Sequence, residues 1–174
     1  MKKRFFTLIE LMVVITIIVI LIGLLLPVIL TVKDQAKKTQ ARSQMSSIIT
    51  AMRTYESTYG ILPIPDSWTD GSGAFPSKYA DLMALLTDVP GPSTESNYTS
   101  GNSRNIRFLD VPTNYTTLGF LDPWGSRYLI YVDSGYAGSV VVNSGSGNET
   151  LYGTVFIYST AGTTTPSKYV YSWK

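Results

Sequence analysis

The sequence has 174 residues, enough for one domain of ordinary size, and 44% of them are hydrophobic while only 15% are charged. The formal net charge is +2, and Lys2, Lys3 and Arg4 supply three of the 14 cations, so no basic patch remains that would indicate a nucleic-acid partner. Cysteine and histidine are both absent, which excludes disulfides, thiolate metal sites and histidine-based catalysis.

An uncharged apolar run follows the basic N-terminus and predicts a membrane-spanning helix. No side chain from Leu11 to Val32 is charged. As a helix these residues would extend roughly 33 Å, which matches a hydrocarbon core of about 30 Å. A secretory signal peptide is the main alternative, but it would have a shorter apolar region and a small-residue cleavage site, which residues 33–37 do not provide. Basic residues lie on both sides of the run, so charge leaves its orientation open.

Two residues interrupt this uniform helix. Glu10 lies at the edge of the apolar run, where an ionised carboxylate is costly unless it lies near the headgroups or has a cationic partner. Glu10 therefore either marks the headgroup boundary or pairs with a cation when the helix leaves lipid and packs against others. Pro27 lacks an N–H group and its ring clashes with the carbonyl of Gly23, so we expect the helix to kink or loosen between Gly23 and Pro27.

The helical pattern continues beyond the apolar run as an amphipathic segment. One apolar face is predicted by spacings of 4, 3, 4, 3 and 4 residues along Ala41, Met45, Ile48, Met52, Tyr55 and Tyr59. Gly60 provides a C-terminal stop, which Pro63 and Pro65 reinforce. We therefore predict one helix from Phe6 to Tyr59, with a transmembrane segment at 6–32 and an amphipathic continuation at 33–60.

The remaining residues, 61–174, are predicted to form a globular domain. After a Pro/Gly-rich connection, residues 77–89 read as a short helix with Leu82, Leu85, Leu86 and Val89 on one face. Residues 91–105 are polar and lack an apolar period, which predicts a variable surface loop. Aromatic and β-branched segments predict strands at 127–133, 139–142, 154–159 and 168–173. A long helix packed on a small antiparallel sheet is an α+β fold.

The start of the apolar run resembles the class III signal of type IV pilins and pseudopilins, because a short basic leader precedes Phe6-Thr7-Leu8-Ile9-Glu10-Leu11-Met12-Val13-Val14-Ile15. The resemblance implies that a prepilin peptidase removes residues 1–5, that the new amine of Phe6 is methylated, and that Glu10 pairs with an N-terminal amine during filament assembly. It also implies the pilin fold, in a single-pass protein of the bacterial inner membrane with a cytoplasmic leader and a periplasmic globular domain. The family has a small residue, usually Gly, before the cut where this chain has Phe5, so we expect slow cleavage.

A second resemblance links Leu121-Asp122-Pro123-Trp124-Gly125-Ser126-Arg127-Tyr128 to the Asp-Pro-Trp-Gly turn of type II secretion major pseudopilins. Pro123 and Gly125 suit a turn and Trp124 offers a large buried anchor, although any small β-domain could use such a turn. Those relatives bind calcium near a C-terminal loop through two Asp side chains and main-chain oxygens. Residues 161–169 contain no carboxylate, so we expect no tight calcium site here and no other cofactor.

Together the resemblances imply a structural subunit of a type II secretion pseudopilus, which assembles with its own copies into a helical filament that drives protein export. The expected partners are the membrane, the prepilin peptidase, other pseudopilins and the inner-membrane assembly platform, without nucleic acid. Two alternatives remain: a type IV pilus subunit for adhesion, motility or DNA uptake, with its filament at the cell surface, and a membrane-anchored domain that never assembles. We expect no enzymatic activity, because the sequence pattern pairs no nucleophile with a base.

Overall fold

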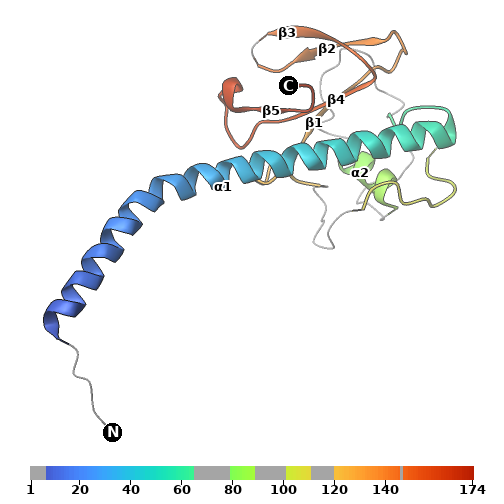
Figure 1. The fold of residues 1–174 in the computed structure, drawn as a ribbon. Helices are drawn as coiled ribbons and strands as arrows, with labels where there is room; N and C mark the ends of the chain where they lie inside the picture. The colour runs from blue at the N-terminus through green and yellow to red at the C-terminus, as the bar shows by residue number, and fades with distance from the viewer. Residues whose placement is uncertain (1–6, 65–78, 89–100, 111–119, 146) are drawn as a thin grey trace. The chain divides into compact units, whose positions relative to one another are not determined.

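The structure, a computed structural model, describes residues 7–64, 79–88, 101–110, 120–145 and 147–174, without the side chains of residues 26–30 (Figure 1). The chain divides into two compact units, Met1–Lys37 and Lys38–Lys174. The helix α1 (Leu8–Tyr59) contributes to both units, whereas the second helix and all the strands that the structure describes belong to the second unit. The expected coarse architecture is therefore present: an apolar N-terminal helix, and a body that contains small antiparallel sheets.

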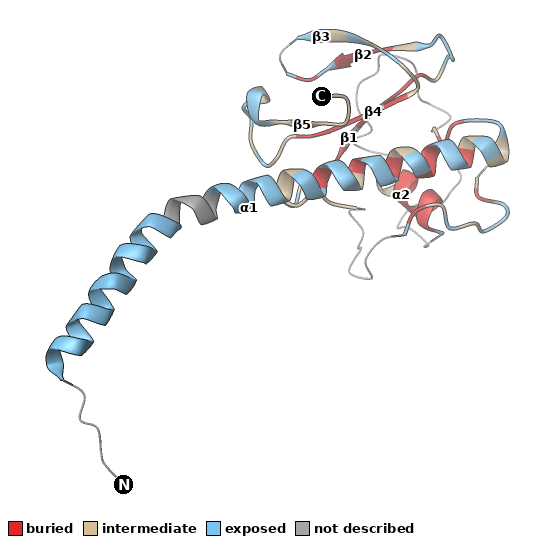
Figure 2. Ribbon diagram, viewed as in Figure 1, coloured by how far each residue is buried: buried red, intermediate tan, exposed pale blue. Residues whose placement is uncertain are grey.

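The helix α1 spans 52 residues, and its predicted course is confirmed from Leu8 to Tyr59, while Phe6 lies outside the described residues. In the second unit five of the six residues of the predicted apolar face are buried, namely Ala41, Met45, Ile48, Met52 and Tyr55, whereas Tyr59 is half-buried (Figure 2). Gly60 ends the helix as predicted, with a φ of +79° and an N–H that donates to the carbonyl of Glu56 at 2.7 Å. Glycine suits this position because it lacks the Cβ that disfavours the left-handed conformation.

The second unit contains two small antiparallel sheets. Three strands, β1 (Leu129–Val132), β4 (Val155–Ser159) and β5 (Val170–Tyr171), form a sheet in the order β1-β4-β5. The strands β2 (Ser139–Asn143) and β3 (Asn148–Tyr152) form a separate hairpin. Each pairing is antiparallel, as the sequence predicts for this part of the chain.

Two strands differ from the sequence prediction. The sequence does not predict β3, because three of its residues, Asn148–Thr150, are polar and carry little strand preference. Pairing with β2 makes it a strand, with Leu151 opposite Val140. The prediction of a strand at 168–173 is too long, because Pro166–Lys168 form a 3-10 turn and only Val170–Tyr171 pair with β4.

The second helix and the loop that follows it also correct the prediction. The helix α2 (Tyr79–Thr87) is buried at nearly every position rather than on one face, and Asp88 follows it at a φ of +55°. Ser77 and Val89 lie outside the described residues. The end of the predicted surface loop is anchored, because the buried side-chain amide of Asn102 donates to the carbonyls of Leu85 at 3.2 Å and Ile106 at 2.9 Å.

One apolar core joins α1, α2 and the three-stranded sheet in the second unit. Its buried members include Met45, Ile48, Met52, Leu82, Leu85, Ile130, Ile157 and Val170. Two tyrosine hydroxyls of this core donate hydrogen bonds to groups outside it. Tyr55 donates to the carbonyl of Gly101 at 2.7 Å, and Tyr128 donates to Gln44 Oε1 at 2.5 Å. The core holds the amphipathic part of α1 against the sheet, so that this part of the helix belongs to the body.

Candidate functional site

The N-terminus of α1 is closed by a reciprocal pair of side chains. Glu10 Oε2 accepts hydrogen bonds from the Thr7 N–H at 2.9 Å and from the Thr7 hydroxyl at 2.8 Å. In return the Glu10 N–H donates to Thr7 Oγ1 at 3.3 Å. This is a capping box, in which a Thr before the first turn and a Glu three residues later satisfy N–H groups that the helix leaves unpaired.

Thr7 was not predicted from the sequence as a partner of Glu10. The signal was present in the spacing, because Thr-x-x-Glu directly before an apolar run is the sequence signature of a capping box. The pair uses one carboxylate oxygen, Oε2, and no other described residue hydrogen-bonds to Glu10 Oε1. Glu10 therefore has a local partner and also an oxygen that remains available for a second donor.

The apolar run that follows Glu10 is exposed along its whole described length. Every side chain from Leu8 to Leu25 is exposed, and several large ones are more than half exposed, including Leu8 at 77% and Leu24 at 69%. Within the described residues, this helix alone is long and apolar enough to cross a membrane. Length and composition do not distinguish it from a signal sequence, which would meet the same criteria at this position near the N-terminus. The hydroxyl of Thr16 donates to the carbonyl of Met12 at 2.7 Å, which satisfies that polar group inside the helix.

The remaining N-terminal site residues are only partly described. Phe5 and Phe6, at the expected leader cleavage and N-methylation site, lie outside the described residues. The helix α1 continues through Gly23 and Pro27, and a Cβ at Gly23 would meet no other atom within 4 Å. The side chain of Pro27 is not described, so the expected kink stays a prediction.

The Asp122-Pro123-Trp124-Gly125 turn is built around a buried carboxylate. Asp122 is 5% exposed, and its Oδ1 accepts the N–H groups of Trp124 at 3.0 Å and Ser126 at 2.7 Å. Its Oδ2 accepts the hydroxyl of Ser159, at the end of β4, at 2.5 Å. Gly125 has a φ of +85° and its N–H donates to the carbonyl of Asp122 at 2.9 Å. These residues form a turn, and the Ser159 hydroxyl connects it to β4.

Trp124 anchors the turn less deeply than expected. Its ring is half-buried and packs against the core cluster rather than entering it fully. A Cβ at Gly162 would lie 3.3 Å from the Trp124 Cβ, so the turn lies directly against the loop after β4. This is the loop in which the pseudopilin resemblance would place calcium. The described residues contain no group of three or more His, Cys, Asp or Glu side chains that could hold a metal ion, and the absence of calcium binding stays a prediction.

A cluster of aromatic side chains forms the second hydrophobic centre of the body. The Tyr158 ring lies 6.2 Å from the Tyr131 ring and 5.7 Å from the Tyr169 ring, both stacked. The hydroxyls of Tyr131 and Tyr158 both donate to the carbonyl of Asn143, at 3.0 and 3.2 Å. Burial, together with the neighbouring tyrosines, raises the pKa of Tyr158 above its ordinary value. The sequence indicates strands here but not the convergence of these rings.

The described site residues thus form two groups that are far apart in the sequence. Thr7 and Glu10 cap an exposed apolar helix in the first unit, whereas Asp122 and Ser159 tie a turn to the sheet in the second. The first group closes the end of an exposed apolar helix, and the second stabilises the body. Comparisons of the chain with family models, with curated proteins and with solved structures found no match.

Proposed function

We propose that this chain is a pilin-like subunit of a type II secretion pseudopilus, held in the bacterial inner membrane by α1 and assembled through the same helix into a filament that drives protein export. The observation that carries the proposal is the segment Leu8–Leu25, which is exposed throughout and bears one carboxylate, Glu10, at its start. Exposed apolar surface of this length requires a cover. Lipid tails and neighbouring apolar helices are the two covers that such a helix accepts.

Glu10 would give the assembly its register. In the membrane the capping box occupies one oxygen of the carboxylate and holds it close to the helix end. When the helix exchanges lipid for neighbouring helices, an unpaired carboxylate among them is unfavourable, so the positions that pair it are favoured. The unoccupied Oε1 supports this step, because it can accept a donor from a neighbouring subunit without breaking the cap. The amine of a processed Phe6 is the donor that the pilin resemblance implies.

A second function is favoured by the same geometry: a membrane-anchored domain that does not assemble. The capping box already satisfies part of the Glu10 carboxylate within one chain, so Glu10 has a structural role even in a monomer. In that case Glu10 would serve the helix end alone. The two functions differ in what they require of Glu10, because capping needs a hydrogen-bond acceptor whereas pairing with an amine needs a negative charge.

The test is crosslinking of the full chain in membranes of cells that contain the prepilin peptidase and the assembly platform. Because the sequence has no cysteine, a cysteine introduced at each of Ile17 and Val19 supplies the protein's only thiols. We expect oxidation to give a ladder of multimers in the otherwise unchanged chain. We expect Glu10→Ala, Glu10→Lys and Glu10→Gln to abolish or strongly reduce the ladder, while circular dichroism shows the body still folded.

Glu10→Gln is the decisive variant, because it keeps an acceptor for Thr7 but removes the charge. A ladder that persists at full strength in Glu10→Gln would favour the role of Glu10 in capping alone. The absence of any ladder in the unchanged chain would contradict assembly and support the non-assembling anchor. Loss of enzyme secretion on deletion of the gene would support the pseudopilus, whereas filaments outside the cell would indicate a surface pilus.

A further inference from the structure

A cavity of about 230 Å³ lies on the second unit, between one face of α1 and the end of β5 with the residues that follow it. The α1 wall includes Arg42, Ser46 and Arg53, which lie on one helix face because they are separated by four and seven residues. The other wall includes Tyr171 and Ser172. Binding sites for larger organic ligands are usually about 300–1,000 Å³, so this cavity suits a small group rather than an organic cofactor.

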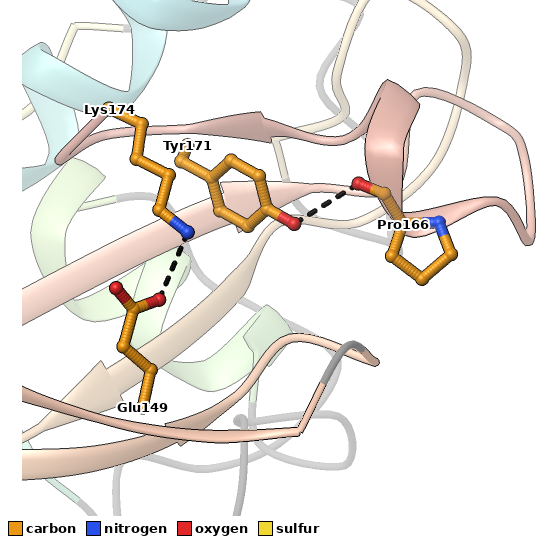
Figure 3. Close-up of polar contacts among 4 residues, drawn as sticks. All are labelled: Glu149, Pro166, Tyr171 and Lys174. Atoms are coloured by element: carbon orange, nitrogen blue, oxygen red, sulfur yellow. Dashed lines mark hydrogen bonds and ion pairs between the residues drawn. The ribbon is translucent and has the colours of Figure 1, made fainter.

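Three cationic side chains line the cavity, and they differ in whether they form an ion pair with a carboxylate. Lys174 also lines it, but its Nζ forms an ion pair with Glu149 Oε2 at 3.0 Å and lies 4.8 Å from the centre of the Tyr171 ring (Figure 3). Arg42 and Arg53 form no ion pair with any residue in the described part of the chain. Two guanidinium groups therefore face the cavity region without a carboxylate to neutralise them.

One hydroxyl group of the cavity, that of Ser172, is held in place by a hydrogen bond in which it is the acceptor. Ser172 Oγ accepts the N–H of Ile157 at 3.0 Å, and this bond fixes the oxygen while leaving its proton for another acceptor. The Ser172 N–H in turn donates to the Ile157 carbonyl at 2.9 Å, so two hydrogen bonds to Ile157 of β4 hold the residue in place. The hydroxyl of Thr50 is already used, because it donates to the carbonyl of Ser46 at 2.9 Å.

We propose that this cavity binds a phosphate group. A carboxylate offers two oxygens, which a single arginine fork can satisfy, whereas a phosphate offers three or more and carries a higher charge. Arg42 and Arg53 lie eleven residues apart, about 16 Å along α1. When both side chains extend toward each other over the cavity, their two forks and the hydroxyl of Ser172 provide more donors than a carboxylate can accept. The phosphate could be free in solution or belong to a lipid headgroup, and the same chemistry serves both. The site is independent of filament assembly.

The test is isothermal titration calorimetry of the full chain in micelles of a neutral, phosphate-free detergent. Inorganic phosphate is titrated at constant ionic strength, with acetate and chloride as the competing anions. We expect saturable phosphate binding that is at least tenfold tighter than acetate binding. Arg42→Gln and Arg53→Gln should each weaken it about tenfold, since each removes charge-assisted hydrogen bonds at an exposed site. Both residues are exposed on α1, so circular dichroism should show unchanged folding.

Arg107→Gln is the matched control, because Arg107 is exposed, lies outside the cavity and makes a long contact of 3.7 Å with Asp110. It should bind phosphate as the unchanged chain does. The proposal is overturned if phosphate gives no saturable heat, if acetate binds equally well, or if the Arg42→Gln and Arg53→Gln double variant keeps full affinity.

A second arm separates the two sources of the phosphate group. The full chain is placed in lipid discs of phosphatidylcholine, with and without phosphatidic acid, and phosphate is titrated again. Loss of the phosphate signal with phosphatidic acid assigns the cavity to a lipid headgroup, and an unchanged signal assigns it to free phosphate. Both outcomes support the site, whereas equal signals from the double variant and the unchanged chain in either disc would contradict it.

Discussion

At the scale of single residues, buried polar side chains determine the connections of the body. Asp122 is the clearest example, because its two carboxylate oxygens accept two backbone N–H groups of its own turn and the hydroxyl of Ser159, 37 residues away. The same hydroxyl accepts the N–H of Ala161 at 2.9 Å, so the turn and the loop after β4 share one network. Buried donors without acceptors cost free energy, which makes this carboxylate a stabilising residue rather than a reactive one.

We predict that Asp122→Ala lowers the free energy of unfolding by about 3 kcal/mol, since it leaves buried N–H groups and a buried hydroxyl without their acceptor. The measurement is urea unfolding of the full chain in micelles, followed by circular dichroism. Asp110→Ala is the control, because the Asp110 side chain is 91% exposed and its loss should change stability by less than about 0.5 kcal/mol. Equal stability of the two variants would mean that the Asp122 network does not stabilise the body.

At the scale of elements, the end of α1 depends on one backbone conformation. Gly60 has a φ of +79°, and a Cβ at this position would meet no atom within 4 Å, so any cost of substitution is conformational rather than steric. We predict that Gly60→Ala destabilises the body by about 1 kcal/mol, because residues other than glycine disfavour the left-handed region. Gly60→Asn should cost less, since asparagine tolerates that region. Urea unfolding measures both, and an equal cost for the two variants would argue against this explanation.

The aromatic residues of β1, β4 and their neighbours make the stability of the body depend on alkaline pH. Burial raises the pKa values of Tyr128 and Tyr158, and the charge of Asp122 adds to the effect at Tyr128. In the unfolded chain tyrosine ionises near pH 10, so above that pH the unfolded state binds fewer protons than the folded state. The stabilisation is complete below about pH 10 and is lost as the pH rises above it toward the folded-state pKa values.

We therefore expect the free energy of unfolding to fall steeply above about pH 10, with tyrosinate absorbance that appears together with unfolding. Complete ionisation of Tyr128 and Tyr158 near pH 10 in a folded body would contradict the prediction.

At the scale of the whole molecule, the two units differ in what they need in order to be stable. Residues 38–174 bury an apolar core that includes part of α1, the helix α2 and the three-stranded sheet. Residues 8–25 bury nothing within the chain. The second unit therefore has its own source of stability, whereas the first requires a lipid or protein environment.

We predict that a chain of residues 38–174 folds in water without detergent, and that its midpoint of urea unfolding matches that of the body in the full chain. The full chain should remain with the membrane fraction and require detergent for extraction. The comparison uses circular dichroism for the short chain and membrane fractionation for the full one. A full-length chain that stays monomeric in detergent-free solution would contradict the membrane assignment, and an unfolded short chain would contradict the independence of the body.

Features that depend on neighbouring residues could be predicted from the sequence. The length of the apolar run, the apolar face from Ala41 to Tyr55 and the end of α1 at Gly60 follow from local periodicity and from the properties of glycine. The capping box of Thr7 and Glu10 belongs to the same class, because its spacing of three residues is visible in the sequence. Strand type was predicted where aromatic and β-branched residues dominate, as in β1 and β4.

Features that join distant parts of the chain were decided by the tertiary structure alone. The polar strand β3 exists because β2 pairs with it, and Asn102 is buried because α2 lies beside it. The contact between Asp122 and Ser159, and the cavity between Arg53 and Ser172, bring together groups that no sequence pattern relates. Periodicity reports which face of one element is apolar, but it carries no information about which distant polar group will lie against that face, and packing of the whole chain makes that choice.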